Sequence, residues 1–205
     1  GESFPVLAVE RFDRSADGSP LPLESIFSIL RTGAPSRFYD STDGTMEDVW
    51  QAVKFATRNQ LQDRQNFFAR FALALLTGNG DLHLENWSLL GRLSEARLSP
   101  VYDPAPMRAY RAFRANHDLL SALPFAGIGG TGQLPGANSG ETPPDLGEKL
   151  IAFGTGLGLS TRSCRERLAE LITLSAEYPA PALAGLARLP ADRRKPNAPE
   201  RAGFA

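Results

Sequence analysis

The sequence is poor in the residues that build disulfides and structural metal sites. It has one cysteine, Cys164, and two histidines among its 205 residues. A single cysteine excludes an internal disulfide and is typical of proteins from a reducing compartment, so we predict a cytoplasmic location. The lack of a cysteine and histidine cluster argues against a structural zinc site.

The chain also lacks a strong excess of charge and a long apolar run. Its formal net charge of -1 gives no support for a surface that binds nucleic acid directly. No apolar run approaches the roughly 20 residues of a membrane-spanning helix, and no signal peptide opens the chain, so we expect no membrane association. The hydrophobic fraction of 42% is ordinary for a globular protein and is enough for a real core.

The most informative stretch that is present is the polar loop 78–86. An apolar helical pattern over 67–76 leads into it, and Gly78 ends that helix because glycine adopts backbone angles that are closed to other residues. Two short apolar runs, 87–90 and 98–101, follow the loop and predict a β-hairpin. The predicted order is therefore a helix, a polar loop and a hairpin.

Asp81 and Asn86 in this loop, with Asp103 at the exit of the hairpin, indicate phosphoryl transfer. Protein kinases place a catalytic Asp five residues before an Asn and carry a second, metal-binding Asp beyond it. This sequence has the same separation and order. One carboxylate orients a hydroxyl nucleophile, while an amide oxygen and another carboxylate suit Mg²⁺. An Asp and an Asn at this spacing also occur in solvated turns, so the surrounding arrangement carries the prediction.

The rest of the chain predicts a mainly α protein with a short β-hairpin. A continuous apolar run predicts a buried strand at 4–10. The spacing of apolar residues predicts helices at 22–30, from 45 onward, and at 62–76, 117–123, 145–153, 161–176 and 181–189. Glycine-rich 127–140 is expected to be a loop, and the polar tail from 191 is expected to fray.

Two local patterns refine this prediction. Thr45 and Asp48 have the spacing of a capping box at the start of a helix. Cys164 shares the predicted inner face of the helix 161–176 with Leu168, Leu171 and Ile172. A small core residue is therefore a better interpretation of this cysteine than a nucleophile.

Three ordered motifs resemble the HipA-like kinases, which are bacterial toxin kinases of toxin–antitoxin modules and include the shorter HipT proteins. The motifs are Val-Leu-Ala-Val-Glu-Arg-Phe-Asp-Arg at 6–14, Gly-Asp-Leu-His-Leu-Glu-Asn-Trp-Ser-Leu-Leu at 80–90, and Leu-Ser-Pro-Val-Tyr-Asp at 98–103. The similarity runs from about Val6 to about Leu159. It implies a diverged protein-kinase fold of which this chain supplies the hinge and the helical C-lobe, with the N-lobe largely absent.

The resemblance also implies a division of the chain. Residues 1–14 would form the last N-lobe strand and the hinge, 15–190 the helical kinase-like C-lobe, and 191–205 a polar tail. At the hinge, the backbone of Glu10 and Phe12 would contact adenine, and Asp13 would lie near the ribose.

The same resemblance assigns roles around the polar loop. Asp81 would be the catalytic base-like acid, and Asn86 and Asp103 would hold Mg²⁺. His83 would lie beside the phosphates of ATP, although a histidine that only orders the loop is an equal alternative. Glu85 departs from the family, which often carries a basic residue at this position.

A larger departure concerns the phosphates. No glycine-rich loop precedes the hinge, and none of the three lysines, Lys54, Lys149 and Lys195, lies in a suitable strand. Positioning of the phosphates supplies most of the catalysis in this chemistry. We therefore expect a truncated kinase that is inactive by itself.

The leading hypothesis is an ATP-dependent and magnesium-dependent serine/threonine kinase of a toxin–antitoxin module. The resemblance implies a HipB-like helix-turn-helix antitoxin as partner and a translation-related substrate, such as an aminoacyl-tRNA synthetase. Two alternatives remain open. The chain could be a noncatalytic kinase remnant that binds an antitoxin, or a kinase-like phosphotransferase that acts on small molecules.

Overall fold

The structure is a computed structural model that describes residues 9–92, 95–107, 121–128, 145–181 and 184. Several predicted features lie wholly or mainly outside this part of the chain: the strand 4–10, the helices 117–123 and 181–189, the loop 127–140 and the tail from 191. The described residues form five α-helices, a 3-10 helix and three short strands. In chain order these are β1 (Leu23–Ser25), α1 (Ile26–Gly33), α2 (Met46–Ala56), α3 (Gln60–Leu76), η1 (Leu84–Asn86), β2 (Ser88–Leu90), β3 (Arg97–Leu98), α5 (Leu146–Gly156) and α6 (Thr161–Glu177).

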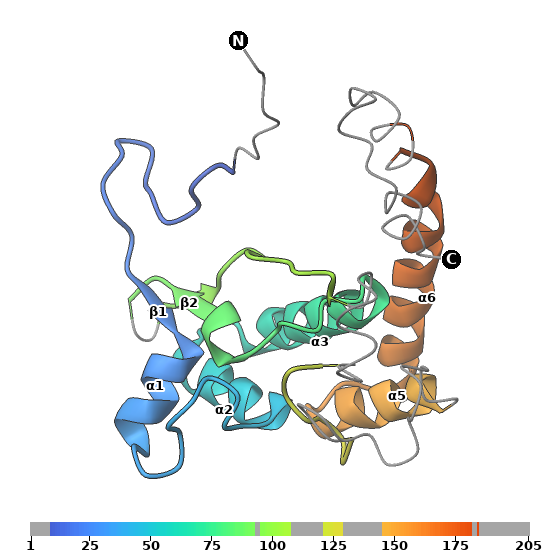
Figure 1. Ribbon diagram of the computed structural model, residues 1–205, viewed down its shortest axis with the longest axis horizontal. Coiled ribbons are helices and arrows are strands. Elements are labelled where there is room, and N and C mark those ends of the chain that lie inside the picture. The colour runs from blue at the N-terminus through green and yellow to red at the C-terminus, as the bar shows by residue number, and fades with distance from the viewer. Residues whose placement is uncertain (1–8, 93–94, 108–120, 129–144, 182–183, 185–205) are drawn as a thin grey trace.

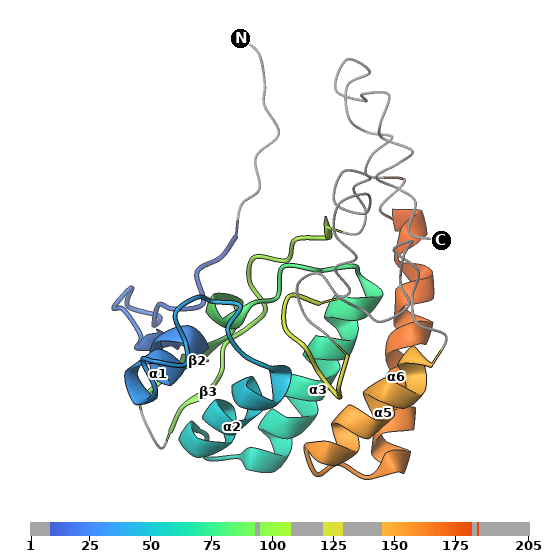
Figure 2. The same ribbon diagram turned by 60° about the horizontal axis from the view of Figure 1, so that its bottom comes forward.

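Helix α3 is the central element of the fold, as the sequence predicts. It packs against α2 on one side and α6 on the other, and α5 packs against α6 (Figures 1 and 2). Phe67, Phe68 and Phe71 of α3 are fully buried. Because this helix lies in the core, its C-terminal end gives the polar loop 78–86 a rigid starting point.

The predicted β-hairpin is present and has a third strand beside it. β2 pairs antiparallel with β3 and also with β1, so the strand order is β1-β2-β3. Leu89 lies opposite Leu98, and Leu90 lies opposite Leu23. The small sheet therefore ties the start of the described chain to the segment that follows the polar loop.

The prediction of one helix over 22–30 is wrong at its beginning. Residues Leu23–Ser25 are extended and pair with β2, and α1 begins only at Ile26. The side chain of Ser25 accepts a hydrogen bond from the backbone N–H of Ser28, which makes Ser25 the N-cap. Pro22 thus precedes a strand instead of standing in the first turn of a helix.

The capping box predicted before α2 is confirmed. The Thr45 side chain accepts from the backbone N–H of Asp48, and the Asp48 carboxylate accepts from the backbone N–H of Thr45. The prediction that Cys164 is a core residue is also confirmed, since its side chain is fully buried. Ile172 was placed on the same inner face, but it is 57% exposed because the C-terminal half of α6 extends beyond the helices beside it (Figure 1).

Four phenylalanines join the separate segments into one core. The rings of Phe71 and Phe125 lie 4.6 Å apart, and the ring of Phe153 lies 5.2 Å from Phe71 and 5.8 Å from Phe125. Phe67 lies 6.1 Å from Phe153. These edge-on and tilted contacts connect α3, α5 and residues 121–128. No helix in the described ranges is long and apolar enough to cross a membrane.

Candidate active site

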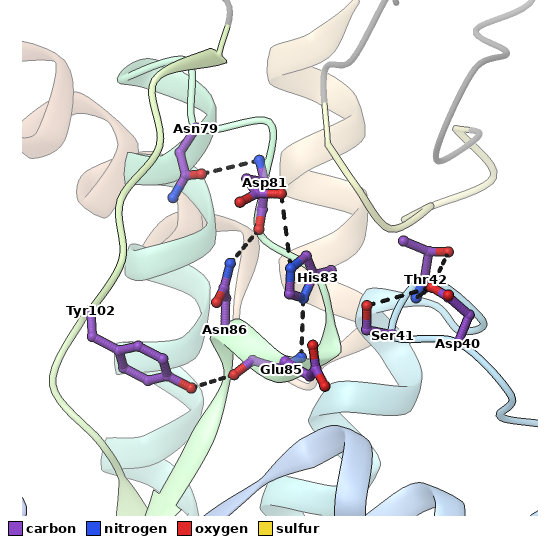
Figure 3. A network of polar contacts seen from close by, with 9 residues as sticks. All are labelled: Asp40, Ser41, Thr42, Asn79, Asp81, His83, Glu85, Asn86 and Tyr102. Carbon is purple, nitrogen blue, oxygen red and sulfur yellow. Dashed lines mark hydrogen bonds and ion pairs between the residues drawn. The ribbon is translucent and has the colours of Figure 1, made fainter.

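The polar loop begins where α3 ends, and its first side chain fixes the position of Asp81. Gly78 has a positive φ of 69°, which suits glycine at the end of a helix. The next residue, Asn79, is only 5% exposed. Its Oδ1 accepts a hydrogen bond of 3.2 Å from the backbone N–H of Asp81 (Figure 3). The Gly-Asn-Gly stretch indicated only a turn, so the sequence did not reveal this role of Asn79.

Asn86 holds Asp81 from the other side. Its Nδ2 donates a hydrogen bond of 2.6 Å to the backbone carbonyl of Asp81 (Figure 3). A carbonyl can only accept, so this contact identifies which atom of the amide is nitrogen. The Oδ1 atom of Asn86 is consequently left for another partner. The five-residue separation seen in the sequence is thus a direct contact in the structure.

His83 lies between Asp81 and the short helix η1. It is the N-cap of η1, and its Nδ1 accepts a hydrogen bond of 3.3 Å from the backbone N–H of Glu85. This contact places the proton of the neutral ring on Nε2. Nε2 lies 3.8 Å from Oδ1 of Asp81. The three residues 81, 83 and 86 are therefore close together.

The loop 40–43 packs beside His83, although the sequence gave it no role. The backbone N–H of Leu84 donates to the carbonyl of Ser41 at 2.9 Å. The pKa of the Asp40 carboxyl is lowered, chiefly because it accepts hydrogen bonds from the Thr42 N–H and hydroxyl, with a smaller contribution from His83. Figure 3 shows this loop facing the residues of the polar loop.

Tyr102 connects the hairpin exit to the polar loop and to the predicted hinge. Its hydroxyl donates to the carbonyl of Glu85 at 2.5 Å (Figure 3). The same hydroxyl lies 2.6 Å from Oγ of Ser88. Burial raises the pKa of Tyr102, so the hydroxyl keeps the proton that it donates. The ring of Phe12 lies 5.8 Å from the ring of Tyr102. Segments distant in sequence thereby meet at this tyrosine.

Asp103 follows Tyr102 in an unusual backbone conformation. Its φ is +47°, one of only two positive values among the non-glycine residues that the structure describes. Its neighbours Val101 and Pro104 line the same pocket as Asn86. No hydrogen bond within the described chain joins the Asp103 carboxylate to Asp81 or Asn86. The segment that carries Asp103 therefore lies near the polar loop, but the Asp103 side chain makes no hydrogen bond with Asp81 or Asn86.

The hinge residues predicted to contact adenine and ribose lie near the start of the described chain. Glu10 is exposed, and Phe12 is half-buried against Tyr102. The Asp13 carboxylate accepts from Arg11 and Arg14. The hydrogen bond from Arg11 is the main reason why the pKa of Asp13 is lowered to about 2.

The oxygen atoms at this site fit a hard cation that also binds phosphate. In the ranges that the structure describes, no three Cys, His, Asp or Glu side chains lie close enough to hold a metal ion. Mg²⁺ beside a nucleotide does not need three such side chains. One or two protein ligands are enough, because phosphate oxygens and water molecules complete the coordination of the ion. The amide of Asn86, whose nitrogen is already engaged by Asp81, has its oxygen available for this purpose.

Two curated relatives resemble this chain. A Haemophilus influenzae protein named "Putative kinase" is 26% identical over 168 residues, which are 78% of this chain and 48% of that protein. "Putative kinase Y4dM" of Sinorhizobium fredii is 30% identical over 119 residues, which are 58% of this chain and 24% of that protein. The chain thus spans less than half the length of either relative.

A solved structure shows the same fold. It is the toxin–antitoxin complex of HipA, HipB and operator DNA from Shewanella oneidensis, which matches with a TM-score of 0.67 and 20% identity over 95% of this chain and 46% of that chain. Residues 2–176 match the family model described as "HipA-like C-terminal domain". The chain therefore belongs to the HipA-like C-terminal domain family.

Proposed function

We propose that this chain carries the catalytic residues of a HipA-like serine/threonine kinase and has the architecture of a kinase C-lobe. The observation that best supports this is the pair of side-chain amides around Asp81. Asn79 accepts from its backbone N–H, and Asn86 donates to its carbonyl. Both backbone groups of Asp81 are thereby fixed, and a fixed backbone is what a catalytic carboxylate requires for orientation.

The Asp81 carboxylate is the group that receives the acceptor hydroxyl. Its side chain is 39% exposed, so a protein hydroxyl can reach it. In this role it orients the hydroxyl and accepts its proton during transfer of the γ-phosphoryl group of ATP. His83 lies beside it, with Nε2 at 3.8 Å from Oδ1 of the carboxylate.

Asn86, through Oδ1, and Asp103 are the residues that would hold Mg²⁺. When bound, the ion supplies positive charge that offsets the phosphate oxygens of ATP. Tyr102 supports both ligands, because it precedes Asp103 in the chain and binds the carbonyl of Glu85 next to Asn86. Phe12 contacts Tyr102, and this contact supports the proposal that the backbone of Glu10 and Phe12 binds adenine, with Asp13 near the ribose.

The chain spans less than half the length of the relatives that it matches, so its partner and its substrate are proposed from those relatives and from the family. We propose a HipB-like helix-turn-helix antitoxin as partner, since the solved relative is a complex with HipB. The proposed substrate is a serine or threonine of a translation-related protein, such as an aminoacyl-tRNA synthetase, as the family resemblance implies.

The proposal is tested by two carboxylate substitutions in the full-length protein. Asp81→Asn leaves the two backbone hydrogen bonds intact and removes only the charge, so Mg²⁺·ATP should still bind while phosphoryl transfer falls at least about 100-fold. Asp103→Asn removes a charged metal ligand, so the affinity for Mg²⁺·ATP should fall about tenfold or more. Calorimetric titration measures binding, and transfer from labelled ATP measures activity.

A separate result would contradict each assignment. If Asp81→Asn transfers the phosphoryl group at the wild-type rate, Asp81 is not the catalytic residue. Equal Mg²⁺·ATP affinity for wild type and Asp103→Asn removes Asp103 from the metal site. A wild-type protein that binds Mg²⁺·ATP but phosphorylates no protein favours the noncatalytic remnant or the small-molecule phosphotransferase instead.

A further inference from the structure

A pocket of about 330 Å³ opens between α3, the segment 99–106 and the end of α6. Its size is within the range of pockets that bind small molecules. Apolar side chains form most of its surface, among them Leu73, Leu82, Trp87, Val101, Pro104 and Tyr178. Three of these, Leu73, Val101 and Tyr178, are large hydrophobic residues that remain exposed. The pocket is therefore a largely apolar and accessible cavity.

Arg70 introduces a positive charge into this apolar wall. It is half-buried on α3 and lines the pocket. Its guanidinium makes no hydrogen bond or ion pair with any residue in the described ranges, whereas Arg37 and Arg14 each contact a carboxylate. Burial lowers the pKa of Arg70, and the nearby Asp63 only partly opposes this effect. An arginine that is partly desolvated and unpaired favours an anionic ligand.

Asn79 supplies a second polar group to the same pocket. The residue is only 5% exposed, and its Oδ1 is engaged by the backbone N–H of Asp81. Its Nδ2 donates no hydrogen bond to any residue that the structure describes. Figure 3 shows this nitrogen directed away from Asp81, on the side of the segment that carries Tyr102, which is the segment that forms the pocket wall. A donor held in this way is suited to an acceptor atom of a ligand.

Arg70 and Asn79 occupy different places on the pocket wall. Arg70 lies on α3, whereas Asn79 lies in the loop after Thr77 and Gly78, where its backbone N–H donates to the carbonyl of Ala74 at 2.8 Å. Ala74 follows Arg70 by four residues, which corresponds to roughly 6 Å along the helix axis. A ligand that satisfies both groups therefore needs a carboxylate at one end, an apolar body, and a hydrogen-bond acceptor at a distance from the carboxylate.

We propose that this pocket binds a small amphipathic carboxylate, with its carboxylate at Arg70 and a carbonyl oxygen at Nδ2 of Asn79. The apolar body of the ligand packs between Leu73, Val101 and Tyr178. The binding is independent of the proposed kinase activity. The ligand also lies against residues that the proposed function uses, because Asn79 accepts a hydrogen bond from Asp81 and Asn86 lines the pocket.

The test compares three matched probes in calorimetric titrations of the 205-residue chain. The first probe, 5-oxo-5-phenylpentanoate, has the carboxylate, the carbonyl and an apolar ring. For a ligand of this size that fits its pocket, we expect a Kd of about 1 mM or lower. The neutral amide 5-oxo-5-phenylpentanamide lacks the charge, and 5-phenylpentanoate lacks the carbonyl, so each should bind about tenfold more weakly.

Two substitutions assign the contacts to their residues. Arg70→Met provides an apolar side chain of similar length and removes the charge. The affinity for the carboxylate probe should fall about tenfold, and the affinity for the neutral amide should not change. Asn79→Asp keeps an acceptor for the Asp81 N–H and removes the donor. It should therefore lower the affinity for the two probes that carry the ketone carbonyl, 5-oxo-5-phenylpentanoate and its amide. Arg97→Met, at the exposed position of strand β3, is the control and should change neither affinity.

The neutral amide also reports whether the Arg70 variant is folded, because its binding depends on the shape of the pocket and not on the charge. Equal affinity of wild type for 5-oxo-5-phenylpentanoate and its amide overturns the proposal. So does an Arg70→Met variant that binds the carboxylate as wild type does, or the absence of saturable binding of the first probe.

Discussion

At the scale of single residues, the contacts of His83 favour a positioning role over a direct role in transfer. One ring nitrogen accepts from the Glu85 N–H and caps η1, and the other faces the Asp81 carboxylate. The ring is therefore engaged on both sides by its own loop. Because η1 carries Asn86, a cap on this helix also stabilises the proposed metal ligand.

This role predicts a difference between two substitutions at His83. Asn can accept from the Glu85 N–H as an N-cap, whereas Ala cannot. For the proposed kinase activity, we expect His83→Asn to keep kcat within about threefold and His83→Ala to lower it about tenfold, since a lost cap costs on the order of 1 kcal/mol. Amide exchange at Glu85 should be faster in His83→Ala only. An equal loss of kcat in both variants would show that the imidazole acts directly.

The sequence could predict the spacing of the site but not the side chains that support it. The five-residue separation of Asp81 and Asn86 is visible in the sequence, and the two residues are in contact in the structure. Asn79 carries no such signal, because an Asn between two glycines is as common in an unremarkable turn. Tyr102 could be linked to the site only through pairing of strands and packing of Phe12, which depend on the folded chain.

At the scale of elements, the helices with a strong apolar period were predicted within a few residues, and the strand β1 was missed. The apolar faces of α3 and α6 are visible in the sequence, whereas their N-caps, Asn59 and Ser160, were not identified from it. β1 has only three residues, and its partner β2 begins 65 positions after it. A strand of that length has no periodicity of its own, so its conformation is determined by the pairing.

The contact between α5 and α6 depends on a glycine whose role is also invisible in the sequence. A Cβ at Gly154 would lie 2.4 Å from Sγ of Cys164 and 2.8 Å from the ring of Phe68. Real contacts of a Cβ are not that short, so these helices approach each other closely only because residue 154 has no side chain. Three helices meet at this point, since Phe68 belongs to α3.

Gly154→Ala is therefore expected to lower the free energy of unfolding by about 1–3 kcal/mol through overpacking. Gly147→Ala is a matched control on the same helix, because a Cβ there meets nothing within 4 Å. This control should be neutral or stabilise by up to about 1 kcal/mol, as helix propensity favours alanine. Urea denaturation measures both. A Gly154→Ala protein as stable as wild type would mean that the helices separate without cost.

At the scale of the whole molecule, helix α3 supports both the hydrophobic core and the polar loop of the candidate site. Phe67 and Phe71 of α3 contact Phe153 of α5, and Phe71 also contacts Phe125. The polar loop leaves the C-terminal end of the same helix. Because one core joins these elements, we expect the described helices to unfold together, and Cys164 lies inside that core.

Cys164 reports this global unfolding, because it is the only cysteine and is fully buried. Burial raises the pKa of its thiol in the folded state. A raised folded-state pKa contributes stability that is fully present below the unfolded value of about 8.5 and is lost as the pH rises through the folded value. The free energy of unfolding should therefore decline above about pH 8.5, and Cys164→Ala should lack this part of the decline.

Labelling by a thiol reagent provides the matching kinetic measurement. At pH 7.5 the folded protein should react orders of magnitude more slowly than the urea-unfolded chain, because only opened molecules expose the thiol. The labelling rate should follow global stability, so the Gly154→Ala protein should react about 5-fold to 150-fold faster than wild type if its stability falls by about 1–3 kcal/mol. Rapid stoichiometric labelling of the native wild type would show that α6 detaches from α3 and α5 without unfolding of the core.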